Sequence, residues 1–322
     1  MTLTNYWWLL IWLFIGGGAL AVFMPKRQEI VLGKTEERWG MLSAFVLILP
    51  YIIWAGFRSN SFGDTGVYQG SFRECVASLE QIGIYLSGIS KDKGFYFLMA
   101  LEKSIFGDSD TLYFLLLAAF QLLIVMWMCR KYSEDYWFSI FLFIASTDYL
   151  SWSFNGIRQF TAVVMVYAAT PLILKKKYIP SIIIILLAST MHQSALLMIP
   201  VIFIIQGKAW NKKTIICILA SLVALVFVDQ FTNILDSLLA ETQYVNVVSD
   251  YKSWNDDGTN PIRVLVYSIP MILSIVGLRY IREEDNPIIN MTVNASIITT
   301  GLLIISAGTS GIFLGSCLLY TS

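Results

Sequence analysis

Long apolar runs separated by short charged segments set the pattern of this chain. A bilayer core about 30 Å thick is crossed by a helix of about 20 apolar residues, and most of the runs approach that length. The two runs on either side of His192 are shorter, and we expect them to be tilted, thin or re-entrant. They cover approximately residues 6–24, 40–57, 111–129, 136–150, 160–174, 181–190, 194–205, 214–228 and 264–278, and a last run begins near residue 287. The pattern predicts an all-α, multipass transmembrane helix bundle of about ten spans, forming a single membrane domain over residues 1–322.

Two features of the apolar runs bear on how the helices pack. The first run has no basic segment before it and no cleavage site after it, so we expect a retained span and not a signal peptide. Its glycine triplet, residues 16–18, permits close approach of a neighbouring helix. In the second run, Pro50 predicts a kink.

The distribution of basic residues predicts the orientation of the bundle, because cytoplasmic loops are enriched in lysine and arginine. If the first span ends in the cytoplasm, strict alternation places most of the 22 basic residues in short inner segments, around residues 26–38, 130–131, 175–177, 208–213 and 279–282. The same alternation places the amino terminus outside, together with two long polar loops at about residues 58–110 and 229–263. The first loop contains GFYFLMALEKSIF, an amphipathic piece expected to lie in the membrane interface.

The composition supports a membrane protein and argues against several other classes. The chain is 57% hydrophobic and 14% charged, and its formal net charge of zero gives no support to nucleic-acid binding. The four cysteines, Cys75, Cys129, Cys217 and Cys317, lack CxxC spacing, which favours core residues over metal ligands or disulfides. No nucleotide-binding loop, zinc motif or nucleophile elbow occurs in the sequence. We therefore expect no cofactor and no metal ion.

The polar groups that stand out are Arg158 and His192, the only histidine in the chain. Arg158 and Gln159 begin the apolar run at residues 160–174, and the chain returns to the same end of the bundle at His192. An arginine costs about 2.5–3.5 kcal/mol at the centre of a membrane helix and less near the interface, so such a residue is usually retained for a function. The pattern therefore predicts a candidate site at the outer rim.

The residue types at this rim suit an anionic substrate. Small residues share the helical face of Arg158, which predicts that this side chain points into the bundle. A guanidinium at headgroup level suits a phosphate or pyrophosphate, because its planar fork offers paired donors. His192 can take or give a proton near neutral pH, and Asp64 is a candidate acceptor for a hydroxyl proton.

Each of these residues also has a purely structural interpretation. Arg158 and Arg58 would equally suit snorkelling or anchoring at the interface. A histidine at a turn is often a hydrogen-bonded structural residue, and Asp64 in GDTG is a common turn residue. The residue pattern alone leaves both interpretations open.

An ordered set of short motifs resembles the EpsG family of multipass bacterial proteins. It comprises Arg58, Asp64, Tyr68 and Phe72 in R-x5-D-x3-Y-x3-F, then GFYFLMALEKSIFG, KYS at 131–133, IRQ at 157–159 and LASTMHQSALLMIP. The resemblance covers about residues 56–205. The family acts in exopolysaccharide and capsule synthesis and is related to Wzy-type O-antigen polymerases, which are placed with the GT-C glycosyltransferases. Such chains usually continue with a further arginine-bearing motif and a closing span, so we expect a truncated C-terminus, with residues of about 316–322 not native.

The resemblance implies a polymerase that joins oligosaccharide units carried on undecaprenyl pyrophosphate at the outer face of the bacterial plasma membrane. In the mechanism that we expect, Arg158, with Arg58 or Arg263, holds the pyrophosphate of the donor and stabilises its charge as it leaves. His192 or Asp64 accepts the proton of the attacking sugar hydroxyl. Gln159 and Tyr68 are expected to complete the substrate site.

Two other functions remain open, a flippase for lipid-linked oligosaccharide and a membrane acyltransferase that modifies polysaccharide. Transporters usually carry ionisable groups at mid-membrane and internal repeats, whereas here the polar groups gather at one face. An acyltransferase would need an acyl donor from the inside. Expected partners are the lipid-linked oligosaccharide, membrane lipid, a chain-length regulator and export machinery, and no nucleic acid is expected.

Overall fold

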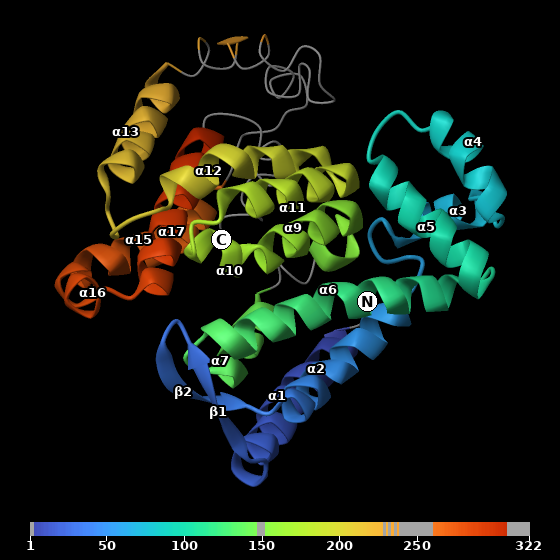
Figure 1. Cartoon of the computed structure of the whole chain (residues 1–322), viewed down its shortest axis with the longest axis horizontal. Coiled ribbons are helices and arrows are strands. Elements are labelled where there is room, and N and C mark those ends of the chain that lie inside the picture. Colours follow the sequence, from blue (N-terminus) through green and yellow to red (C-terminus); the bar gives the residue numbers. More distant parts are fainter. Residues whose placement is uncertain are drawn as a thin grey trace. The chain divides into compact units, whose positions relative to one another are not determined.

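The computed structural model describes residues 3–146, 152–227 and 260–307, together with positions 230, 233, 234 and 237 (Figure 1). The described residues are mostly helical. Among the described residues, four helices or helix pairs are long and apolar enough to cross a membrane, or five if α15 (Pro261–Val276) and α16 (Leu278–Glu284), bent by 68° at their junction, form one span. Four shorter apolar helices accompany them. These helices confirm an all-α membrane protein, while the count of about ten spans stays a prediction.

The chain divides into two compact units. The first comprises residues 1–170 and 183–195, and the second comprises residues 171–182 and 196–322. The predicted loop at 58–110 belongs to the first unit. Most of the predicted loop at 229–263, and residues 316–322, lie outside the described residues.

The helices and strands of the first unit follow one another in this order: α1 (Leu3–Phe23), β1 (Lys26–Val31), β2 (Lys34–Trp39), α2 (Met41–Gly56), α3 (Thr65–Glu74), η1 (Leu79–Gln81), α4 (Ile82–Ser87), α5 (Lys93–Phe106), α6 (Asp110–Tyr132), α7 (Tyr136–Ala145), α9 (Ile157–Ala168) and the end of α11 (Tyr178–Met191). The second unit holds most of α10 (Thr170–Leu174), the start of α11, α12 (Met198–Ile204), α13 (Lys212–Val226), α15 (Pro261–Val276), α16 (Leu278–Glu284) and α17 (Pro287–Ala307). A 3-10 turn, η2 (Gln193–Leu197), follows α11.

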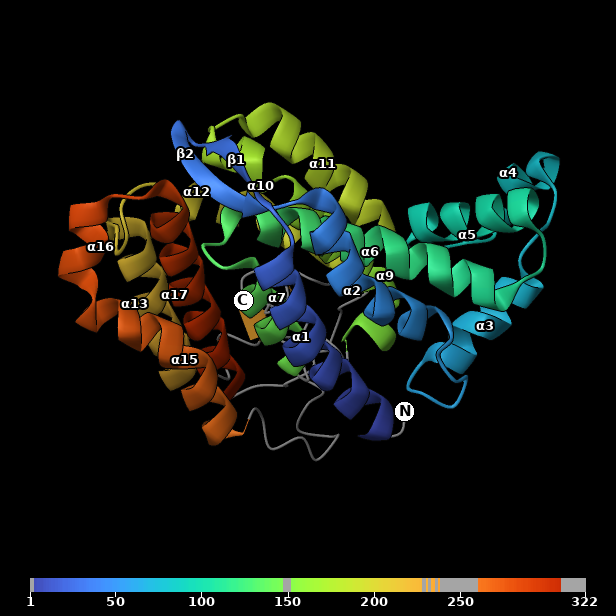
Figure 2. The same ribbon diagram turned by 90° about the horizontal axis from the view of Figure 1, so that it is seen from below.

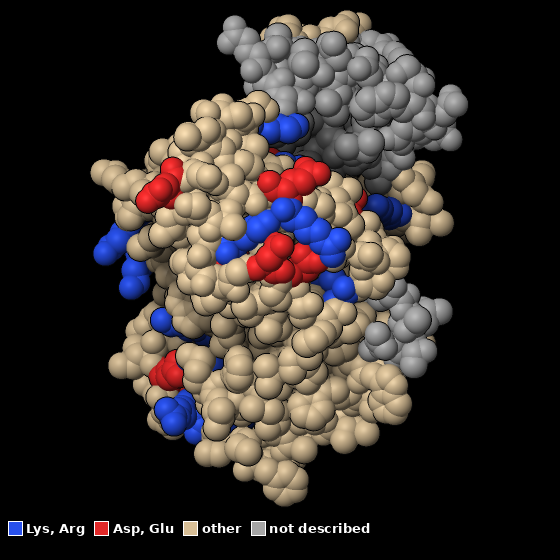
Figure 3. All heavy atoms as spheres, turned by 90° about the vertical axis from the view of Figure 1, so that its right-hand side faces the viewer, with Lys and Arg blue, Asp and Glu red and all other residues tan. Residues whose placement is uncertain are grey.

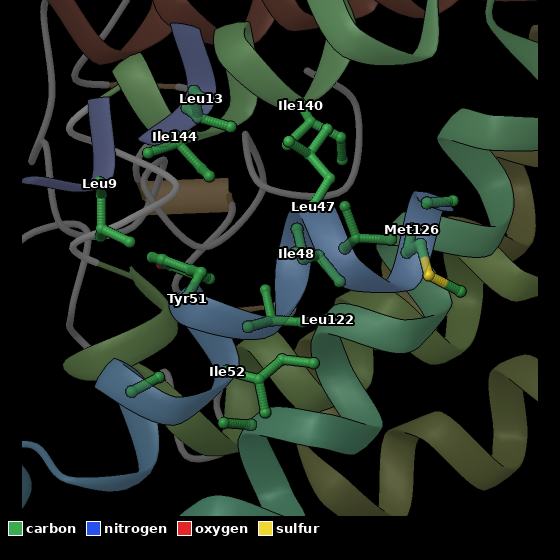
Figure 4. Packing of buried hydrophobic residues seen from close by; sticks show 14 of the residues in the cluster. Leu9, Leu13, Leu47, Ile48, Tyr51, Ile52, Leu122, Met126, Ile140 and Ile144 are labelled. Carbon is green, nitrogen blue, oxygen red and sulfur yellow. The ribbon is translucent and has the colours of Figure 1, made fainter. Parts of the chain in front are cut away.

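The core of the first unit forms where α1, α2, α6 and α7 pack together. Buried residues on α2 recur at helical spacing, so that one face of this helix meets α6. In Figure 4, Leu47, Ile48 and Tyr51 lie among side chains of neighbouring helices, including Leu122 of α6 and Ile140 of α7. Pro50 stands inside α2, which remains one helix through it.

Close packing of α1 against α7 depends on the glycine triplet. The indole Nε1 of Trp137 on α7 donates to the carbonyl of Leu13, 2.7 Å away. A Cβ atom at Gly17 would overlap this indole nitrogen, whereas one at Gly18 would lie 3.6 Å from the nearest ring atom. The sequence-based prediction of a close helix approach at the triplet is therefore confirmed at Gly17.

We expect Gly17→Ala to destabilise the protein and Gly18→Ala to be tolerated. Both substitutions gain the same helix propensity, about 0.5–1 kcal/mol, but only the first overpacks the contact with Trp137, at a cost of about 1–3 kcal/mol. Thermal unfolding of the two variants in one detergent checks this, with Gly17→Ala unfolding several degrees lower. Equal midpoints for the two variants would contradict the packing argument.

The charged segment between the first two spans folds as a β-hairpin, which the sequence analysis treated only as an inner loop. Strands β1 and β2 pair antiparallel, with Lys26 opposite Trp39. The turn residues Leu32 and Gly33 both have positive φ, as a two-residue hairpin turn requires. Arg130, near the end of α6, makes a two-pronged ion pair with Glu29, at 2.7 and 3.0 Å, and donates to the carbonyl of Trp39. The hairpin is thereby fastened to α6.

The segment at 58–110 contains the α-helices α3, α4 and α5 and the 3-10 turn η1. On α3, the spacing of four residues places Asp64, Tyr68 and Phe72 along one face, and the last two are buried. Lys103 of α5 donates to the carbonyls of Phe72 and Arg73, so it satisfies the carboxyl end of α3. Figure 3 shows the face that carries these helices, where acidic and basic side chains gather in a band beside a large uncharged area.

In the second unit, α17 packs against α13 and α15 (Figure 2). Asn294 of α17 is fully buried; its amide donates to the carbonyl of Ile205 at 3.0 Å and its oxygen accepts from the backbone N–H of Trp210 at 3.0 Å. One turn earlier, Asn290 accepts from the N–H of Ala209. These two asparagines hold the turn that leads from α12 into α13.

Candidate functional site

Arg158 lies in the first turn of α9, and its guanidinium is only partly covered. Its Nη1 donates to Oδ2 of Asp92 at 2.8 Å, and the exposed fractions of the two side chains are 26% and 1%. A cation at the start of a helix is disfavoured by the helix dipole, so the carboxylate compensates the charge. Gln121 of α6 also bonds this first turn of α9: its side-chain amide donates to the hydroxyl of Thr161 at 2.9 Å and to the carbonyl of Ile157 at 3.3 Å.

Asp92 comes immediately before α5 and has a left-handed backbone, with φ of 56°. Its carbonyl accepts from the N–H of Phe95 in the first turn of α5. A Cβ atom at Gly94 would overlap Thr190, so only glycine lets the start of α5 lie against the end of α11. Burial raises the pKa of Asp92, and Arg158 and the backbone N–H of Gln193 oppose that rise.

His192 occupies the break between α11 and η2, outside both helices. Its Nδ1 lies 2.6 Å from Oγ of Ser194, and its backbone N–H donates to the carbonyl of Ala188. Burial, and then the charges of Arg158 and Lys91, lower the pKa of His192 to about 4. The imidazole is therefore neutral at pH 7. The charge of Arg158 thus acts on His192, which directly follows α11. That the two residues share a substrate site at an outer rim stays a prediction.

Tyr68 and Asp64 approach this environment from α3. The guanidinium carbon of Arg158 lies 6.0 Å from the ring centroid of Tyr68, whose ring also packs edge-on against Phe95. Asp64 is exposed at the start of α3, one turn before Tyr68, and its side chain makes no capping hydrogen bond. The buried ring of Tyr68 therefore lies beside the arginine, and the exposed carboxylate of Asp64 lies one turn before Tyr68.

Arg58 has a different setting from Arg158. Its guanidinium carbon lies 4.4 Å from the ring of Phe154 and 5.0 Å from that of Phe114, and it donates to the carbonyls of Ala55 and Ser153. Burial lowers the pKa of Arg58 to about 10, so it stays charged at neutral pH. These contacts are those of a brace between α2 and the segment before α9. Its predicted role on pyrophosphate stays a prediction.

The two remaining predicted residues are Gln159, which follows Arg158 in the first turn of α9, and Arg263. Gln159 is buried, with 4% of its surface exposed. Arg263 is exposed at the start of α15 in the second unit, 5.7 Å from the ring of Tyr267. Its predicted cooperation with Arg158 stays a prediction.

Asp92 is the residue of this cluster that the sequence analysis missed. One signal could have pointed to it: an arginine expected to face inward needs a carboxylate partner, and Asp92 precedes the amphipathic helix in the first outer segment. No spacing rule selects it among the acidic residues of that segment. Within the described parts of the chain, no group of three or more histidine, cysteine or acidic side chains could hold a metal ion.

Comparison with known proteins identifies the family. A family model described as the EpsG family matches residues 41–320, which is most of the chain. A search of curated proteins and a search of solved structures give no match. The resemblance drawn from the short motifs is therefore confirmed.

Proposed function

The chain belongs to the EpsG family, and we propose that it is a membrane glycosyltransferase that polymerises oligosaccharide repeats carried on undecaprenyl pyrophosphate. The observation that carries this proposal is the Arg158 cluster. A partly exposed guanidinium stands at the head of a candidate span, fixed on one side by Asp92 and close to the neutral His192. Such a group suits the diphosphate of a lipid carrier at headgroup depth.

In the proposed reaction, a hydroxyl of the acceptor sugar attacks the anomeric carbon of the donor repeat. The bond from that carbon to the phosphate oxygen breaks, and undecaprenyl pyrophosphate leaves with the bonding electrons. Arg158 binds the diphosphate and stabilises the negative charge that develops on it; one such donor typically contributes about 10²–10³ in rate. No nucleotide is required, because the carrier already activates the sugar.

His192 is the group we assign as acceptor of the hydroxyl proton. Its Nδ1 is engaged by Ser194, which leaves Nε2 for the substrate. The exposed carboxylate of Asp64 is the alternative acceptor. Tyr68, whose ring lies beside Arg158, and Gln159, Arg58 and Arg263 are the other residues proposed for substrate binding.

The proposal includes a setting for the site. We place the protein in the bacterial plasma membrane with its amino terminus outside, ten spans in a GT-C-like bundle, and the Arg158 cluster at the outer face. A chain-length regulator and export machinery are the proposed protein partners. The inner basic segments predicted from the sequence support this orientation.

Elongation by the purified protein tests the proposed function. The full chain is reconstituted in vesicles with lipid-linked repeats isolated from a polymerase-deficient strain. Glycan length is read on a gel, and released undecaprenyl pyrophosphate is measured by mass spectrometry. A ladder of lengths with matching carrier release supports a polymerase. Transfer of unchanged repeats between leaflets would support a flippase instead, and transfer of acyl groups without elongation would support an acyltransferase.

The pH dependence of elongation tests the assignment of His192. A general base must be unprotonated, and with a pKa of about 4 His192 is unprotonated throughout pH 6–8. We therefore expect a flat rate from pH 8 to pH 6, with a fall only as the pH approaches 4. An ordinary histidine would give a fall centred near about pH 6.5. The control is His192→Gln, which we expect to be slower by about 10²–10⁴; wild-type rates in that variant would exclude His192 as the base.

A further inference from the structure

We propose that Asp92 is a positioning residue for Arg158: its buried carboxylate holds Nη1 of the guanidinium so that the exposed donors of Arg158 face the diphosphate. This inference rests on the proposed function and adds to it a residue that does not touch substrate. With 1% of its side chain exposed, Asp92 lies behind the arginine, whereas Arg158 retains 26%. The covered and open sides of the cluster are thus distinct.

The geometry of the pair explains how one contact can orient the whole group. A guanidinium is planar and carries its five N–H donors in a fixed arrangement. Fixing Nη1 on Oδ2 of Asp92 at 2.8 Å therefore limits the directions of the other donors. The side chain loses rotational freedom before the substrate arrives, so less is lost on binding and the donors already point where charge develops.

The carboxylate is itself held in place by the packing around it. Asp92 stands in the left-handed region just before α5, and the next helix residues include Gly94, which lets α5 lie against Thr190 of α11. The chain reaches His192 two residues after Thr190. The same contact between α5 and α11 therefore locates both the anchor of Arg158 and the turn that carries His192.

Lengthening the side chain of residue 92 distinguishes a positioning role of Asp92 from a role as a mere counter-charge to Arg158. Asp92→Glu keeps the negative charge and the possibility of an ion pair, but moves the carboxylate by one methylene. Because a misplacement of about 1 Å can lower a rate by about 10², we expect kcat per folded enzyme to fall at least about tenfold, with the donor KM changed by less than about threefold. Asp110→Glu is the matched control, since Asp110 pairs with Arg73 away from the cluster, at 2.6 Å. That variant keeps wild-type kcat.

Folding is measured alongside rate by thermal unfolding in detergent. If Asp92→Glu lowers the midpoint of thermal unfolding, Asp92→Asn is measured as well, because it preserves the size of the side chain. The same fall of at least about tenfold in kcat per folded enzyme is expected of it. A wild-type kcat in both variants would overturn the inference. If Arg158→Ala elongates glycan normally, the proposed function itself is wrong. If Arg158→Ala loses elongation while both Asp92 variants keep a normal kcat, only the role of Asp92 is refuted.

Discussion

Arg158→Ala is expected to abolish elongation and leave single repeat units on the lipid carrier. Without the guanidinium, nothing from α9 stabilises the leaving diphosphate, and a loss of about 10³ in rate is expected. Arg158→Lys keeps a charge but lacks the planar fork that binds two oxygens at once, so we expect a loss of about 10². Complementation of a polymerase-deficient strain, with glycan length read on a gel, measures both effects.

Arg158→Ala and Arg158→Lys differ in their expected effect on folding, so comparing them separates a loss of activity from a loss of folded protein. Alanine leaves the buried carboxylate of Asp92 without its cation, at a cost of about 3–5 kcal/mol. Lysine can still compensate that charge, so the loss of long glycan in Arg158→Lys reports on function. Arg73→Ala is the control, because Arg73 is a largely exposed arginine paired with Asp110 on the same unit. Long glycan from Arg158→Ala would exclude the proposed site.

The largest expected effect on stability is at Asn294. Its side chain bonds the backbone of the turn at Ile205 and Trp210 while being fully buried. Asn294→Ala leaves several buried backbone groups without partners, each costing about 1–3 kcal/mol. We expect the variant to be lost from the membrane fraction, or to unfold more than 10 °C lower, since about 1 kcal/mol shifts the midpoint by a few degrees.

Thr292→Ala is the matched control for this experiment. Thr292 lies two residues earlier on α17 but is exposed, and its hydroxyl bonds only to carbonyls of its own helix. We expect wild-type levels and a midpoint within about one degree, as is usual for exposed substitutions of under about 0.5 kcal/mol. Equal behaviour of the two variants would contradict the structural role of Asn294.

The helices and the location of Arg158 could be predicted from the sequence, because each depends on local information. An apolar run of the right length specifies a membrane helix, and the expected runs at 111–129 and 264–278 correspond to α6 and α15. Alternation of the runs predicts that Arg158 and His192 lie at one end of the bundle. The hairpin was missed because its residues are strongly charged, and its alternation is too short to distinguish from a loop.

The partner of Arg158 could not be predicted, because it depends on tertiary contact. Asp92 and Arg158 are 66 residues apart, and their meeting requires the packing of α5 on α11. The neutral state of His192 has the same origin, since burial and two neighbouring cations displace its pKa from the ordinary value. Likewise, only the fold shows that Arg58 is covered by the rings of Phe114 and Phe154.

Helix α6 connects two features that lie far apart along it. Near its end, Arg130 forms an ion pair with Glu29 of the β-hairpin. Near its middle, Gln121 donates a hydrogen bond to Thr161 of α9. An α-helix is a stiff rod that rises about 1.5 Å per residue, so nine residues span about 14 Å between these two contacts. A displacement of the hairpin is therefore expected to pass along α6 to the first turn of α9, which carries Arg158.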